Sequence, residues 1–293
     1  KESNQNVLYG YGIRIMKDGA WGFAHSNVFS DEALVKTVQK AFETAKLSAL
    51  VKNGAGLRLA NEKSYDATYR TPFKIDPFNI PLKEKAELFM EINRRMLNYK
   101  EIKKAVTFFN AQKDEKLYAS TLGTRLDINT LYINPMVTAY AMTDTDTQSR
   151  TFDEGGRNTG WEWLEDLNLL EKSKYIAEEA IMKVHADEIG EEKRRSLILD
   201  PNHLGLTMHE SVGHPTELDR VLGWEADFAG ISFATPEKLG NYQYGSKIVN
   251  FVGDNTLEGG LATAGFDDDG VPGQKWHIIK DGILKEYGTT RET

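Results

Sequence analysis

Two histidines and a glutamate between residues 204 and 215 are the side chains of this sequence best suited to chemistry. They form the pattern His209-Glu210-x-x-x-His214, which is one residue longer than the His-Glu-x-x-His pattern of zinc peptidases. In the shorter pattern two histidines on one helix face bind the metal, and the glutamate serves as general base for a water molecule. The pattern is compatible with metal-assisted hydrolysis, but the spacing alone fits equally a chance arrangement of two ordinary histidines.

The extra residue between the two histidines creates a geometric problem for a shared metal ion. On an ideal α-helix, residues i and i+4 lie about 40° apart around the axis, whereas residues i and i+5 lie about 140° apart. We expect the helix to end within the pattern, because Gly213 can adopt a left-handed conformation there and Pro215 disfavours the α region for His214. His214 would then lie on the chain as it folds back toward His209.

Helical periodicity and β-rich runs predict the elements around this segment. A hairpin is expected at the start of the chain, with Lys17-Asp18-Gly19 as its turn, and Ser30 is the expected N-cap of the helix that follows. Apolar residues at helical spacing predict helices over residues 31–49, 82–99, 170–188 and 203–212. Short β-rich runs predict an antiparallel meander of four strands over 106–143, with turns at Lys113-Asp114, Gly123 and Asn134-Pro135. Further strands are expected at 196–199, 247–253, 274–279 and 283–288, the last two joined by the turn Lys280-Asp281-Gly282.

This order of elements predicts an α+β fold with two domains. An N-terminal α+β domain of antiparallel sheet and amphipathic helices is expected over residues 1–192. A strand-rich C-terminal domain that carries the histidine pattern is expected over residues 193–293. Gly190 and the charged run at residues 191–195 mark the boundary between them.

Composition narrows the classes of function. The 293 residues include 36 Lys and Arg against 44 Asp and Glu, a net charge of −8, so direct binding to nucleic-acid phosphates is not expected. No run of about 18 apolar residues is present, and a membrane-spanning helix is therefore not expected. The sequence contains no cysteine, which removes thiolate nucleophiles and cysteine ligands from this stretch and favours a cytoplasmic location.

The residues around the two histidines resemble the metal-binding segment of the TldD/PmbA family, whose members are described as modulators of DNA gyrase and as zinc metallopeptidases. The similarity rests on Met208–Pro215 with Glu217, Asp219 and Arg220, on residues 266–272 and 283–287 downstream, and on residues 12–14 and 22–24 near the start. The histidine pattern is typical of the TldD-like members and is lacking in their PmbA/TldE-like partners.

The resemblance implies roles for the three residues and a setting for them. His209 and His214 would be zinc ligands, and Glu210 would be the catalytic base. Expected substrates are peptides or unfolded proteins. The expected partner is a PmbA/TldE-like subunit, or a second copy of the chain, which would enclose a chamber with it.

This sequence departs from the family at the third zinc ligand. In the family that ligand is a cysteine well downstream, and members are longer at both ends, so we expect the C-terminal part of the catalytic domain to be absent here. If the chain is complete, a carboxylate such as Glu217, Glu225 or Asp227 would have to complete the site. The first hypothesis is a TldD-like zinc metallopeptidase, and the alternative is a non-catalytic binding or regulatory subunit of a TldD/PmbA-type complex.

Overall fold

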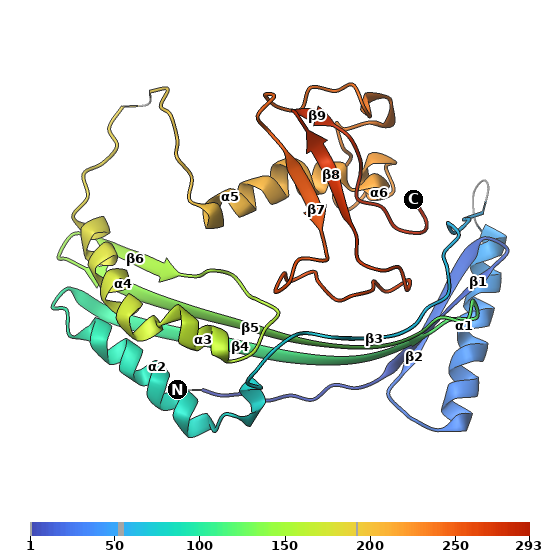
Figure 1. Ribbon diagram of the computed structural model, residues 1–293, viewed down its shortest axis with the longest axis horizontal. Coiled ribbons are helices and arrows are strands. Elements are labelled where there is room, and N and C mark those ends of the chain that lie inside the picture. The colour runs from blue at the N-terminus through green and yellow to red at the C-terminus, as the bar shows by residue number, and fades with distance from the viewer. Residues whose placement is uncertain (1, 52–55, 192) are drawn as a thin grey trace. The chain divides into compact units, whose positions relative to one another are not determined.

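The computed structural model describes residues 2–51, 56–191 and 193–293, which separate into two compact units. The first unit comprises the residues up to Asn61 together with Thr290–Thr293, and the second comprises Glu62–Thr289. Each unit contains both helices and strands (Figure 1), which confirms the predicted α+β class. The division into domains at residues 192 and 193 stays a prediction.

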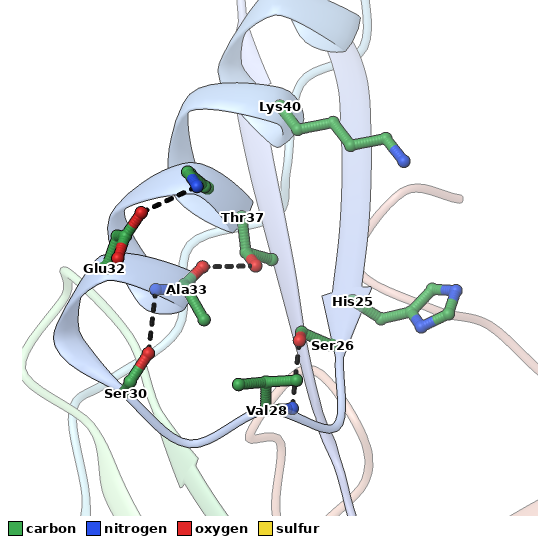
Figure 2. Close-up of a pocket in the computed structure, with 9 residues that line it drawn as sticks. His25, Ser26, Val28, Ser30, Glu32, Ala33, Thr37 and Lys40 are labelled. Carbon is green, nitrogen blue, oxygen red and sulfur yellow. Dashed lines mark hydrogen bonds and ion pairs between the residues drawn. The ribbon is translucent and has the colours of Figure 1, made fainter.

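The first unit is a β-hairpin packed against one long helix. Strands β1 (Tyr11–Lys17) and β2 (Ala20–Ser26) are antiparallel, and the predicted turn places Asp18 and Gly19 at positive φ, as a tight type I′ hairpin requires. Helix α1 (Asp31–Val51) follows. Figure 2 shows its first turns beside the end of β2, where an open groove lies. The Oγ of Ser30 accepts a hydrogen bond from the N–H of Ala33 at 3.2 Å, which confirms the predicted N-cap.

The second unit begins with a four-stranded sheet and three helices around one apolar core. The strands are β3 (Asp66–Arg70), β4 (Ile102–Ala119), β5 (Arg125–Met142) and β6 (Thr147–Phe152), and the helices are α2 (Leu82–Leu97), α3 (Glu162–Leu167) and α4 (Leu169–Val184). Strand β5 pairs antiparallel with β4 and β6 and parallel with β3 (Figure 1). The helices predicted over residues 82–99 and 170–188 are therefore confirmed as α2 and α4.

The meander of four short strands predicted over residues 106–143 is wrong, because two strands of 18 residues take its place. Lys113 and Asp114 were the expected first turn, but they continue the ladder opposite Leu131 and Thr130. The turn that joins β4 to β5 is the one expected at Gly123, which has a φ of +94°.

Pro135 is tolerated in the middle of β5 because of the side to which its nitrogen points. Ile133 directs its N–H away from β4, toward the carbonyl of Arg157 at 3.0 Å. Since alternate residues of a strand direct their N–H groups to the same side, the nitrogen of Pro135 also points away from β4. It falls between the end of the β3 pairing at Asn129 and the start of the β6 pairing at Val137, where no ladder bond is lost.

The second unit ends in a region of small elements that carries the histidine pattern. These are α5 (Pro201–Met208), a π-helical turn (His209–Gly213), a 3₁₀ turn (His214–Thr216), α6 (Leu218–Val221), β7 (Phe251–Asp254), β8 (Lys275–Lys280) and β9 (Ile283–Leu284). Strands β7, β8 and β9 form an antiparallel sheet. The strand predicted over residues 196–199 is wrong: Leu197 and Ile198 are exposed, and the described strands offer them no partner.

A small core joins α6 to β9. It consists of Val221, Ala234, Leu284 and Tyr287, and the Tyr287 hydroxyl donates to the carbonyl oxygen of Ala234 at 2.7 Å.

In the described part of the chain, no helix has both the length and the apolar character needed to cross a bilayer.

Candidate metal centre

The structure brings His209, Glu210 and His214 together. Each side chain offers one ligand atom, and the three atoms all lie within 4.8 Å of one another. The imidazole centroids are 4.2 Å apart with an interplanar angle of 71°. The side chains of His209 and Glu210 are 57% and 62% exposed, and that of His214 is 30% exposed, so the cluster is open to solvent.

A π-helical turn, and not the end of the helix, solves the spacing problem of the two histidines. The backbone N–H of His214 donates to the carbonyl oxygen of His209, and such an i to i+5 bond places these two residues one above the other. The left-handed Gly213 and non-helical His214 expected from the sequence are wrong. Gly213 has φ −55° and ψ −68°, and His214 has φ −59° and ψ −44°, both in the right-handed helical region.

Pro215 interrupts the α-helical hydrogen-bond pattern at this point. In a continuous α-helix the carbonyl of Ser211 would accept from the N–H of residue 215, and proline has none. The structure satisfies this carbonyl from outside the helix, because the hydroxyl of Tyr244 donates to it at 2.5 Å. The hydroxyl of Thr216, which is 2% exposed, donates to the carbonyls of Val212 at 2.7 Å and Gly213 at 3.2 Å.

Tyr244 supports the turn from outside and was not predicted from the sequence, although Pro215 at the fourth position after Ser211 signalled an unpaired carbonyl. The tyrosine lies in an aromatic cluster with Phe233 and Tyr242, with centroid distances of 5.5 and 5.8 Å. Burial raises the pKa of Tyr244 to about 12, with a smaller contribution from Tyr242. Its hydroxyl therefore stays protonated, and a donor, at neutral pH.

Hydrogen bonds with Gly288 and Ser232 fix the chain that follows the π-helical turn. The N–H of Leu218 donates to the carbonyl of Gly288 at 2.9 Å, and the N–H of Gly288 donates to that of Thr216 at 2.8 Å. The hydroxyl of Ser232 donates to the carbonyl of Pro215 at 2.6 Å. These bonds hold the backbone on both sides of Glu217 in place.

The three carboxylates considered as additional ligands lie outside the cluster. The Oε1 atom of Glu217 lies 3.0 Å from Nδ1 of His214, and its Oε2 atom lies 3.3 Å from Nη2 of Arg220. Glu225 contacts the same arginine at 3.2 Å, and Asp227 is exposed. Among the described residues, the ligand group of three contains Glu210 as its only carboxylate.

The donor set of this cluster fits zinc. Two imidazoles are nitrogen ligands that zinc takes in proteins, and the carboxylate of Glu210 lies beside them. Two ligands of a tetrahedral zinc ion lie about 3.4 Å apart, given bond lengths of about 2.1 Å. The separations within 4.8 Å therefore need only small side-chain rotations to reach that geometry.

Comparisons with known proteins agree with the resemblance. Three family models match the chain: PmbA/TldA metallopeptidase domain 1 over residues 1–45, the central domain over 75–186, and the C-terminal domain over 192–293. A metalloprotease of Methanocaldococcus jannaschii is 30% identical over 286 residues, which are 97% of this chain and 60% of that protein. A zinc metalloprotease TldD homologue of Saccharolobus solfataricus is 21% identical over 303 residues, 99% of this chain and 60% of that protein.

Solved structures share the fold. A Thermotoga maritima protein described as a modulator of DNA gyrase superposes with a TM-score of 0.69 at 22% identity, covering 95% of this chain and 59% of that one. TldE of Thermococcus kodakarensis gives 0.57 at 17% identity, covering 94% and 59%. The chain thus spans about 60% of the length of the curated relatives it matches. With all three family domains matched in order, the chain belongs to the PmbA/TldD metallopeptidase family.

Proposed function

We propose that this chain is of the TldD-like type and takes part in zinc-dependent hydrolysis of peptide bonds. His209 and His214 hold the ion, and Glu210 is the general base. The observation that carries the proposal is the π-helical turn, which places two imidazoles five residues apart on one side of the chain with Glu210 beside them.

The residues divide the work in the following way. When bound, zinc supplies Lewis-acid activation of the attacking water and of the substrate carbonyl. The exposed carboxylate of Glu210 accepts the proton of the attacking water and returns it to the leaving amine. To serve as ligands, His209 and His214 must each have one unprotonated ring nitrogen. The open position of the cluster suits an extended peptide, so the proposed substrates are peptides and unfolded proteins.

The proposed partner is a TldE-like subunit. Its support is the likeness of this fold to TldE of Thermococcus kodakarensis, since two subunits of one fold can pair through matching surfaces. Glu217 and Glu225 are not proposed as a third ligand, because both carboxylates form ion pairs with Arg220.

The test combines metal content with hydrolysis of an unfolded protein such as casein. We expect about one zinc per chain in the wild type, none after His209→Ala, and a normal zinc content after Glu210→Gln. The Glu210→Gln variant should lose about 100-fold or more of the cleavage rate, because the proton acceptor is gone. Unchanged cleavage would overturn the mechanism. Partner binding without any cleavage by the wild type would favour a non-catalytic subunit.

A further inference from the structure

We propose that Glu217 is a positioning residue of the metal centre, which fixes the tautomer and the orientation of His214. The proposal rests on the function proposed above, because it takes His214 to be a metal ligand. It gives Glu217 a different role from that of a third ligand.

The contact between Glu217 and His214 determines which ring nitrogen remains free. The Oε1 atom of Glu217 lies 3.0 Å from Nδ1 of His214. An ionised carboxylate can only accept hydrogen bonds, so Nδ1 must carry the proton. The lone pair of the neutral ring is then on Nε2, which becomes the atom available to a metal. Metal-bound histidines are commonly held in this way by a carboxylate on the other ring nitrogen.

A second contact keeps Glu217 oriented toward the histidine. Its Oε2 atom lies 3.3 Å from Nη2 of Arg220, whose side chain is 16% exposed. The same arginine contacts Oε2 of Glu225 at 3.2 Å. Arg220 therefore has two carboxylate neighbours, and Glu217 has one partner for each of its oxygens. Movement of Glu217 into the metal sphere would break the contacts to both His214 and Arg220.

Hydrogen bonds also hold the backbone on both sides of Glu217. Glu217 precedes α6, yet its side chain makes no capping bond to that helix. Its carboxylate contacts His214 instead. The bonds between Thr216, Leu218 and Gly288 fix the flanking peptides. A carboxylate on such a backbone holds an imidazole more firmly than one on a mobile loop.

His209 lacks an equivalent contact with Glu210. Its Nε2 atom is 3.8 Å from Oε1 of Glu210, which is too long for a hydrogen bond. The positioning effect should therefore be specific to His214, and removal of Glu217 should leave the tautomer of His209 as it is.

The experiment measures the tautomer and the metal affinity separately. Long-range ¹H–¹⁵N NMR spectra of the metal-free protein report which ring nitrogen carries the proton, and titration with Co²⁺ reports affinity and coordination through its visible spectrum. In the wild type we expect the Nδ1–H form of His214. In Glu217→Ala we expect a shift to the Nε2–H form and a loss of about 10- to 100-fold in Co²⁺ affinity, with the intensity of the bound Co²⁺ spectrum retained.

Two further variants separate a positioning role from general damage. Glu217→Gln keeps the shape and an acceptor oxygen, so it should retain the Nδ1–H form and lose less affinity than Glu217→Ala. Glu225→Gln removes a carboxylate from Arg220 without touching His214; the proposal gives Glu225 no role, and its Co²⁺ affinity should stay within about twofold of the wild type.

The outcomes distinguish this proposal from the function on which it rests. An unchanged tautomer and unchanged affinity in Glu217→Ala would overturn the positioning role alone. A complete loss of binding, as in His214→Ala, would show that Glu217 is a direct ligand and would also overturn it. If His209→Ala does not weaken Co²⁺ binding, the metal lies elsewhere and the proposed function fails first.

Discussion

The backbone N–H of His214 donates to the carbonyl oxygen of His209, the residue five positions earlier. This bond defines the π-helical turn and joins the two residues proposed as metal ligands. An α-helix of the same sequence would separate them by about 140° around its axis. The site therefore depends on a local change of helix type, and such turns occur frequently at functional sites.

The missing N–H of Pro215 should be one cause of the turn. Pro215→Ala restores a donor that can bond the carbonyl of Ser211 in α-helical geometry, so the segment can rewind and move His214 away from His209. We expect zinc affinity to fall more than about tenfold, since one ligand is displaced, while the circular dichroism of the whole protein changes little.

Pro201→Ala is the matched control, because Pro201 is the first residue of α5, where a proline removes no helical bond. It should leave zinc affinity unchanged. An unchanged affinity in Pro215→Ala as well would mean that Tyr244 and Thr216 alone maintain the turn.

The hydroxyl of Tyr244 should stabilise the turn from outside. Tyr244→Phe removes the donor to the Ser211 carbonyl, and the net loss of one such bond costs about 0.5–1.5 kcal/mol in the free energy of unfolding. Denaturant unfolding of the metal-free protein measures it. Tyr242→Phe removes a hydroxyl from the same aromatic cluster without touching this carbonyl and should cost less. Equal effects would show that the cluster, and not the bond, matters.

Local patterns in the sequence predicted most of the helices and both tight hairpins correctly. The turns at Asp18-Gly19 and Asp281-Gly282 take the positive φ angles that these residue pairs favour, and Ser30 caps α1 as expected. In each case the residues that determine the conformation are neighbours in the sequence. Local chemistry was therefore sufficient.

The errors arose where distant residues decide the conformation. Pro135 is a break signal in isolation, and only the gap between the pairings of β3 and β6 makes it acceptable in β5. Pro215 was expected to end the helix, but Tyr244 donates to the carbonyl of Ser211, 33 residues earlier in the chain. With that external donor the chain stays helical and widens its turn, so the two histidines meet by a route that the sequence did not reveal.

Acid should destabilise the end of β7 through Asp254. Hydrogen bonds from Thr256, followed by the ion pair with Lys275 at 3.0 Å, lower the pKa of Asp254 to about 2. A carboxyl whose pKa is lower in the folded state stabilises the fold above its unfolded pKa of about 3.8. That stabilisation is lost as the pH falls toward 2. Denaturant midpoints should therefore fall between pH 4 and pH 2, and Asp254→Asn should flatten this dependence.

Lys275→Met provides the graded control for that dependence. It removes the ion pair but keeps the hydroxyl and N–H of Thr256, which donate to Asp254 at 2.7 and 2.9 Å. The acid dependence should then be reduced only in part. A slope in Asp254→Asn equal to that of the wild type would assign the acid sensitivity to other carboxyl groups.

The hairpin of the first unit should tolerate no side chain at Gly22. A Cβ at this position would overlap the carbonyl oxygen of Ala41 and the backbone of Ala45 in α1, and neither backbone atom can move without shifting the helix. We expect Gly22→Ala to lower the free energy of unfolding by about 1–3 kcal/mol or more, seen as faster hydrogen exchange in β1, β2 and α1.

Gly205→Ala offers the matched control, because among the described residues a Cβ in this part of α5 meets nothing within 4 Å. Alanine is favoured over glycine in a helix by about 1 kcal/mol, so this variant should be neutral or more stable. Similar exchange in both variants would show that β2 and α1 do not pack as closely as the structure indicates.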